Sequence, residues 1–105
     1  MADDPLDALD ALIRSRRGND PASSYTAQLF ARGREKIAQK VGEEAVETVI
    51  AAMGDNAAAL TGEAADLIYH LLVLLADAGL SLDDVRTELA RRTAQSGLAE
   101  KASRS

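Results

Sequence analysis

Apolar residues recur every three or four positions along most of this chain, which is the pattern of amphipathic α-helices. The first apolar stripe predicts a helix from about Pro5 to Arg17, because proline suits a first helical turn and the polar run 16–21 ends the pattern. The residues of this stripe are Leu6, Leu9, Leu12 and Ile13. A loop is then expected to about Ser24, and no alternating segment of strand length stands out.

A second region of helical periodicity covers residues 25–53. It predicts a short helical turn from Tyr25 through Phe30, a break at Gly33 and a longer helix to about Met53. The expected apolar face of the longer helix is Ile37, Val41, Ala45, Val49 and Ala52. The chain then turns at residues 54–55, where a glycine ends the helix.

The most apolar segment lies in the next predicted helix, over about residues 56–78, which Gly79 closes. In residues 67–76 every side chain except His70 is apolar or tyrosine, so this helix needs cover on nearly all sides. In so small a chain the expected cover is a second subunit. A further helix is predicted from Ser81, with a loose polar tail after about residue 97. Leu82, Val85, Leu89 and Arg92 follow its start at helical spacing.

These elements predict an all-α fold, a helical bundle of four to five helices completed by dimerisation. The 105 residues fit a single domain over 1–105 with an ordered core at about 5–96. A chain of this length buries only part of its surface, which favours self-association. Few aromatic residues and many small aliphatic ones suit closely packed helices.

Charge and cysteine content exclude several classes of function. Lys and Arg number 12 and Asp and Glu number 17, so the net charge of −5 argues against a nucleic-acid or anionic-membrane surface. The sequence has no cysteine, which excludes disulfides, thiolate zinc sites and thiol catalysis. The first residues show no secretory signal pattern, and the apolar run 67–76 is too short to span a bilayer. A soluble, cytoplasmic protein is therefore expected.

Two pairs of carboxylates stand on either side of the turn at residues 54–55. Glu44 and Glu47 are three residues apart on one helix and therefore share a face. Glu63 and Asp66 repeat this spacing on the next helix. Because the linker is short, the two helices are expected to be antiparallel neighbours, and the two pairs should meet at a similar height.

Four carboxylates in one place repel each other. Two unit charges about 4 Å apart cost roughly 4 kcal/mol at an effective dielectric near 20, so either some are protonated or a divalent cation lies among them. The all-oxygen donor set predicts a hard metal, Mg²⁺ with Mn²⁺ as a substitute, whereas one histidine and no cysteine disfavour zinc. The alternative is four solvated acids on a helix surface, which is less attractive for two such pairs on adjacent helices.

Basic residues continue the acidic stripe. Lys36 and Lys40 precede Glu44 and Glu47 on one helical stripe, an arrangement that suits a Mg²⁺–polyphosphate substrate. The alternative is an ordinary Lys40–Glu44 surface pair, worth a few tenths of a kcal/mol. Weaker candidates for phosphate contacts are Arg16, Arg17, Arg32 and Arg34.

Two further residues have open interpretations. Gly42 lies mid-helix at a cost of about 1 kcal/mol against alanine, which either a close approach or simple tolerance explains. His70 is on the stripe of Glu63 and Asp66 and either orients a carboxylate or water, or is a buried, hydrogen-bonded core residue, as a lone histidine among leucines more often is.

Longer strings in this region resemble the phosphoribosyl-ATP pyrophosphatase family, over roughly residues 6–92. The strings are Ser24-Tyr25-Thr26, Lys36-Ile37, 40–47 (Lys-Val-Gly-Glu-Glu-Ala-x-Glu) and 63–75 (Glu-Ala-Ala-Asp-Leu-x-Tyr-His-Leu-Leu-Val-Leu-Leu). The shorter EExxE…ExxD pattern is similar to the wider all-α NTP pyrophosphohydrolase (MazG-like) superfamily. The resemblance implies a helical homodimer that binds phosphoribosyl-ATP and hydrolyses it to phosphoribosyl-AMP and pyrophosphate in the second step of histidine biosynthesis.

The resemblance also implies roles for individual residues. By motif position the Mg²⁺ ligands are Glu44, Glu47, Glu63 and Asp66. Glu43 matches the first glutamate of EExxE and either supports a ligand or helps to activate water. Glu43, Glu44 and Glu47 are therefore the catalytic candidates, and Lys36 and Lys40 are the candidates for substrate binding.

Rival functions remain open at this point. The nearest is a housekeeping (d)NTP pyrophosphohydrolase of the same superfamily. A rival of another class is a non-catalytic helical dimerisation module with an acidic surface. A ferritin-like di-iron site needs Glu-x-x-His pairs, and His70 stands at the wrong offset for one.

Overall fold

The computed structural model describes residues 4–94, which contain five α-helices, one short 3₁₀ turn and no strand. The elements are α1 (Pro5–Ser15), η1 (Pro21–Ser23), α2 (Tyr25–Arg32), α3 (Arg34–Ala52), α4 (Ala57–Asp77) and α5 (Leu82–Thr93). The all-α prediction is thus confirmed. The polar tail expected after residue 97 lies outside the described residues.

Helix ends follow local chemistry that the sequence carries. The Asp4 carboxylate accepts from the amide of Leu6 at 2.9 Å, and Asn56 caps α4 in the same way. Gly79 has φ 78°, and the amide of Leu80 donates to the carbonyl of Leu75 at 2.8 Å, which closes α4 with a glycine cap.

The predicted boundaries differ from the observed ones by a few residues. α1 ends two residues before the predicted Arg17, because tighter i→i+3 hydrogen bonds replace the helical ones after Ser15. α2 runs two residues beyond the predicted Phe30, and the expected loop before it contains η1. The break at Gly33 is confirmed, since its φ of 94° is disfavoured for other residues.

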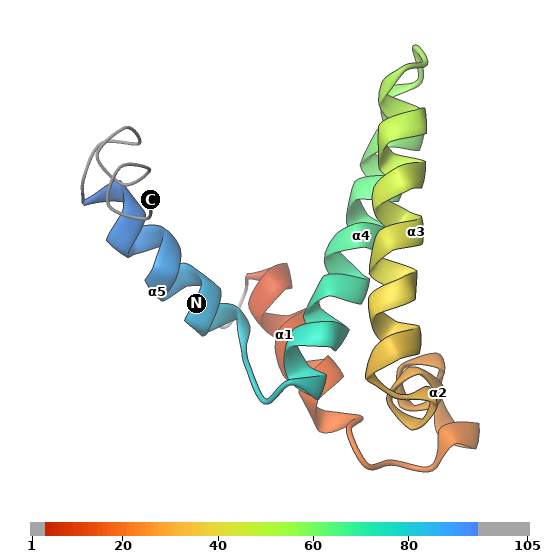
Figure 1. Cartoon of the computed structure of the whole chain (residues 1–105), viewed down its shortest axis with the longest axis vertical. Coiled ribbons are helices and arrows are strands. Elements are labelled where there is room, and N and C mark those ends of the chain that lie inside the picture. Colours follow the sequence, from red (N-terminus) through yellow and green to blue (C-terminus); the bar gives the residue numbers. More distant parts are fainter. Residues whose placement is uncertain (1–3, 95–105) are drawn as a thin grey trace.

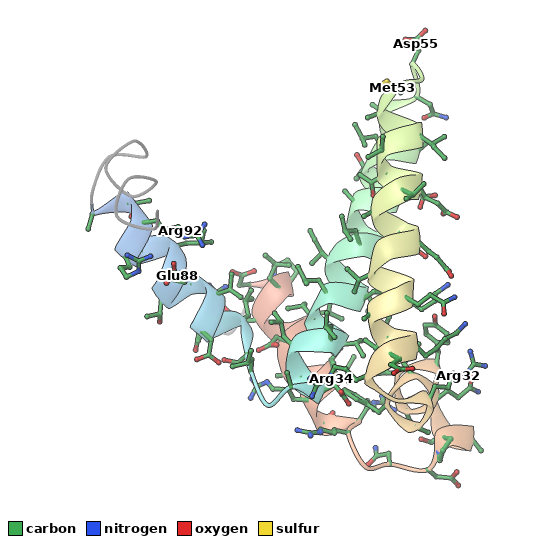
Figure 2. The ribbon with its side chains drawn as sticks, viewed as in Figure 1. Arg32, Arg34, Met53, Asp55, Glu88 and Arg92 are labelled. Atoms are coloured by element: carbon green, nitrogen blue, oxygen red, sulfur yellow. The ribbon has the colours of Figure 1, made fainter. Side chains whose placement is uncertain are left out.

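α3 and α4 form a long antiparallel hairpin, with α1 and α2 packed around its base and α5 extending away from it (Figure 1). Met53 and Asp55 mark the tip of the hairpin, and Arg32 and Arg34 lie at its base (Figure 2). The core is also at the base. Its buried members are Ile13, Leu29, Ile37, Leu72, Val73 and Ala76.

The tip half of the hairpin leaves large apolar side chains exposed. Ile37 is fully buried, but Val49, on the same predicted face of α3, is 62% exposed. The predicted apolar face of α3 is therefore buried near the hairpin base and exposed towards the tip. The exposed apolar residues of the hairpin are Val46, Val49, Ile50, Met53, Leu60, Ile68 and Leu71. We call this set the hairpin patch.

α5 is attached to α1 mainly through charge. The guanidinium of Arg86 pairs with Asp4 at 3.2 Å and with Asp83 at 3.1 Å, and it also contacts Asp7. The amide of Leu82 adds a long hydrogen bond of 3.4 Å to the buried Asp10. This single basic side chain joins the first and last helices of the described chain.

By length and composition α4 is the one helix among residues 4–94 that qualifies for a membrane span. The sequence-based argument considered only residues 67–76, whereas the whole helix has 21 residues. Such a helix is weak evidence, because core helices of soluble proteins pass the same test. α4 also carries Glu63 and Asp66, which are costly inside a bilayer.

Candidate active site

The predicted acidic pairs converge partway along the α3–α4 hairpin. One carboxylate oxygen each from Glu44, Glu63 and Asp66 lies within 4.8 Å of the other two. Glu47 is outside this group of three, but it is close enough to Glu63 to raise the pKa of the Glu63 carboxyl group. Glu47 and Glu63 also line one open cavity of about 320 Å³. We call these four residues the acidic cluster.

Part of the acidic cluster is buried and unpaired. The Glu44 side chain is only 12% exposed. The Oε2 atoms of Glu44 and Glu63 are buried and have no hydrogen-bond partner within residues 4–94. A buried carboxylate oxygen without a partner is costly, and a cation among the carboxylates satisfies both oxygens. The all-oxygen donor set therefore fits a hard divalent ion such as Mg²⁺.

The crowding changes the proton affinity of Glu63. Burial raises the pKa of its carboxyl group above the ordinary 4.5, and the hydrogen bond with Glu47 raises it further. The negative charges of Glu47, Glu44 and Asp66 act in the same direction. The cluster thus has a strong affinity for either protons or a metal ion.

Lys40 and Glu43 form an ion pair on α3 next to the acidic cluster. Lys40 Nζ is 3.2 Å from Glu43 Oε1 and 4.0 Å from Glu44 Oε1. Glu43 also accepts from the Gln39 amide at 2.7 Å, and these two hydrogen bonds lower its pKa. The charge of Lys36 lowers it further, which places Lys36 on the same side. Glu43 is therefore directed towards the basic residues and lies outside the group of three.

His70 lies one helical turn after Asp66 on α4, on the side of the cluster nearer the hairpin base. His70 is 5% exposed, and its Nδ1 lies 2.8 Å from the Asp66 carbonyl oxygen. Its Nε2 lies 3.1 Å from the Tyr25 hydroxyl. His70 is thus buried with both ring nitrogens hydrogen-bonded, as the core interpretation expects.

Two of the four weaker basic candidates, Arg17 and Arg34, are engaged elsewhere. Arg34 Nε lies 2.6 Å from Asp77 Oδ2, and Arg17 donates to the Asp77 backbone carbonyl at 3.2 Å. Both contacts fasten the base of the hairpin, where Figure 2 shows Arg32 and Arg34. They stabilise the end of α4 and do not face the acidic cluster.

Sequence reasoning missed the contacts that α2 makes with α4. Tyr25 stacks on Tyr69 with ring centroids 6.2 Å apart, and the hydroxyl groups of Thr26 and Tyr69 are hydrogen-bonded. These partners are more than 40 residues apart, so no helical spacing connects them. The only available signal was that Tyr25 and Thr26 stand in a short string shared with the family that the sequence resembles.

Comparison with known proteins places the chain in a family. The family model described as phosphoribosyl-ATP pyrophosphohydrolase matches residues 6–93. The chain belongs to this family.

Relatives at high identity agree with this assignment. A phosphoribosyl-ATP pyrophosphatase of Rhizorhabdus wittichii is 62% identical over 94% of this chain and 93% of its own length. Proteins of the same name from Paramagnetospirillum magneticum and Gluconobacter oxydans are 61% and 57% identical over 94% of this chain, covering 91% and 74% of their own lengths. Membership of a hydrolase family favours an enzyme over the non-catalytic dimerisation module.

Mg²⁺ is expected to stabilise the fold against heat. At about a hundredfold excess over its dissociation constant, an ion that binds only the folded chain adds about 2.7 kcal/mol, which is a rise in Tm on the order of 10 °C for a domain of this size. The Glu63→Gln and Asp66→Asn variants should lose most of this rise in a thermal melt. The control is Asp55→Asn at the hairpin tip, which should keep it. Equal Mg²⁺ responses in all four proteins would contradict the site.

The metal-free protein should become less stable as the pH rises through the pKa of Glu63. A folded-state pKa above the unfolded value favours the protonated carboxyl group, so its stabilising contribution is full below pH 4.5 and declines as the pH rises through the raised pKa. The measurement is urea unfolding in the presence of chelator, from pH 4.5 upward. The unfolding free energy of Glu63→Gln, relative to that of the wild type, should increase as the pH rises. Titrating groups away from the acidic cluster are common to both proteins and cancel, whereas the neighbouring carboxylates lose the charge of Glu63 in the variant and change the difference in the same direction. A difference that does not change with pH contradicts this prediction.

Proposed function

We propose that this protein hydrolyses phosphoribosyl-ATP to phosphoribosyl-AMP and pyrophosphate, the second step of histidine biosynthesis. The proposed cofactor is Mg²⁺ held by Glu44, Glu47, Glu63 and Asp66, and Mn²⁺ is a plausible substitute in the same oxygen set. The observation that supports the proposal best is the pair of buried, unpartnered oxygens of Glu44 and Glu63 at the centre of the cluster. Binding of a catalytic metal ion would explain why a chain of this family keeps two buried, unpartnered carboxylate oxygens despite their cost in stability.

The positions of Glu44 and Glu47 suit them to different roles in the proposed reaction. When bound, Mg²⁺ supplies charge neutralisation for the phosphate oxygens and for the pyrophosphate leaving group. Glu44 is the most enclosed acid of α3 and acts as a ligand. Glu47 borders two open cavities, which leaves it room to hold a water and accept its proton as it attacks.

Two lysines of α3 are the proposed contacts for the substrate phosphates. Lys40 and Lys36 neutralise phosphate oxygens that the metal does not reach. Because Glu43 pairs with Lys40 at 3.2 Å and with Gln39 at 2.7 Å, its part in the reaction is to hold Lys40 beside Glu44. Of the two roles considered for Glu43, support of a neighbouring group fits these contacts better than activation of water.

A second copy of this chain is the proposed cover of the hairpin patch. Val49 and Met53 are 62% and 80% exposed, and Ile68 on α4 is 42% exposed. A row of large apolar side chains along two adjacent helices is typical of an interface between protomers. The same cover explains how α4 can be highly apolar in a soluble, cytoplasmic homodimer that binds neither membrane nor nucleic acid.

Pyrophosphate release should distinguish the proposed substrate from its rivals. With Mg²⁺ the wild type should hydrolyse phosphoribosyl-ATP with a kcat/KM well above that for dNTPs, and chelator should abolish the reaction. Glu47→Gln and Asp66→Asn should each lower kcat/KM at least about 100-fold, while Asp55→Asn should leave it unchanged. A preference for free dNTPs would favour the housekeeping enzyme, and activity retained in both cluster variants would exclude the metal mechanism.

Dimerisation can be tested independently of activity. Sedimentation at micromolar concentration should give twice the mass of the chain, and Val49→Glu should give a monomer, because it buries a charge in the apolar interface. Val49 is chosen because it is on the hairpin patch but not in the acidic cluster. Ala22→Glu, an equal charge change on the exposed η1 turn, is the control and should remain dimeric. A wild type that sediments as a monomer contradicts the proposal.

A further inference from the structure

The segment Ser24-Tyr25-Thr26 at the start of α2 has no part in the function proposed above. Two of its residues have clear structural duties. The Ser24 hydroxyl oxygen accepts from the Ala27 amide at 3.0 Å and caps α2. The Thr26 hydroxyl is hydrogen-bonded to that of Tyr69 and fastens α2 to α4. Tyr25 remains to be explained.

Tyr25 is held in one orientation by three contacts. Because the Asp66 carbonyl can only accept a hydrogen bond, His70 Nδ1 donates to it, and Nε2 of the neutral ring accepts from the Tyr25 hydroxyl at 3.1 Å. The Tyr25 ring stacks on Tyr69 at an interplanar angle of 21°. It also meets the His70 ring edge-on, at a centroid distance of 6.0 Å.

The Tyr25 side chain is nevertheless 48% exposed. The burial of this ring stabilises the fold less than full burial would, because about half of the residue stays exposed to water. A rigid aromatic surface of this kind is well suited to bind a planar ligand, because little conformational entropy is lost on binding.

Its location connects this surface to the acidic cluster. The hydroxyl of Tyr25 is bonded to His70, one helical turn from Asp66 on α4. His70 Nδ1 in turn lies 2.8 Å from the backbone carbonyl oxygen of Asp66, whose carboxylate is one of the three that converge. Tyr25 is therefore connected through His70 to the end of the cluster nearer the hairpin base.

We propose that Tyr25 is a substrate-binding residue whose exposed ring stacks on the purine base of the nucleotide, while its hydroxyl remains bonded to His70. The inference rests on the proposed function, because it assumes a nucleotide whose phosphates lie at the acidic cluster. The hydroxyl is already a donor to His70, so it is not free to donate to phosphate. The ring face is what Tyr25 offers to the ligand.

Tyrosine fluorescence tests the contact without turnover. The chain has two tyrosines and no tryptophan, so in Tyr69→Phe all tyrosine emission comes from Tyr25. With Mg²⁺ present, α,β-methylene-ATP should quench this emission, and inorganic triphosphate, which lacks a base, should not. Calorimetry establishes that each ligand binds. Bound α,β-methylene-ATP with unchanged emission would overturn the inference, as would equal quenching by both ligands.

Kinetics separate the ring from the hydroxyl. Tyr25→Leu should raise KM for the nucleotide roughly 10-fold with little change in kcat, since base stacking is worth about that factor or more. Tyr25→Phe keeps the ring and should have a KM close to the wild type. If the two variants behave alike, the hydroxyl or the local fold is responsible and the stacking role is excluded. The Mg²⁺-induced rise in Tm shows that each variant retains its metal site.

The test also separates this inference from the proposed function. If the wild type prefers dNTPs to phosphoribosyl-ATP, the assigned reaction fails, but quenching by α,β-methylene-ATP still supports stacking at Tyr25. If phosphoribosyl-ATP is the preferred substrate and Tyr25→Leu has an unchanged KM, the reaction stands and the inference fails. A Tyr25→Leu protein that sediments as a monomer, together with no quenching, would assign Tyr25 to the interface between copies.

Discussion

Repulsion between carboxylates held on two neighbouring helices is the constraint around which this protein is organised. Glu44, Glu63 and Asp66 bring oxygens within 4.8 Å of one another, and negative charges held this close repel each other. The hairpin that carries them must therefore be held together by other parts of the molecule. Below the cluster, the apolar core at the base of α3 and α4 supplies that support. The α3–α4 hairpin thus carries the apolar core at its base and the acidic cluster further along its length.

The helices and the converging acids could be predicted from sequence because both depend on local spacing. Three-residue separation puts Glu44 and Glu47 on one face, and the short turn at residues 54–55 leaves an antiparallel hairpin as the simplest arrangement. Caps such as Asn56 and Gly79 are equally local, so the helix ends could be placed to within a few residues. The periodic pattern did not reveal that one apolar face of the tip half of α3 is uncovered in the described chain, because Val49 is apolar whether it is buried or exposed.

Contacts between distant side chains could not be predicted. The direction of Glu43 depends on Gln39 and Lys40, which compete with the cluster for its carboxylate, and the sequence offers no measure of that competition. The bond between Tyr25 and His70 depends on how α2 packs against α4, 45 positions further along the chain. The candidate metal ligands could therefore be predicted from spacing, whereas the contacts of Tyr25, the proposed base-binding residue, depend on packing between helices.

The attachment of α5 has a consequence for handling the protein. Arg86 joins Asp4 and Asp7, at the beginning of the described chain, to a helix at its end, and it is the main charged tie between the two. Loss of the Arg86 guanidinium therefore releases α5 from α1. High ionic strength weakens that contact, so α5 should separate from α1 in concentrated salt, while Ile13 keeps α1 packed in the apolar core.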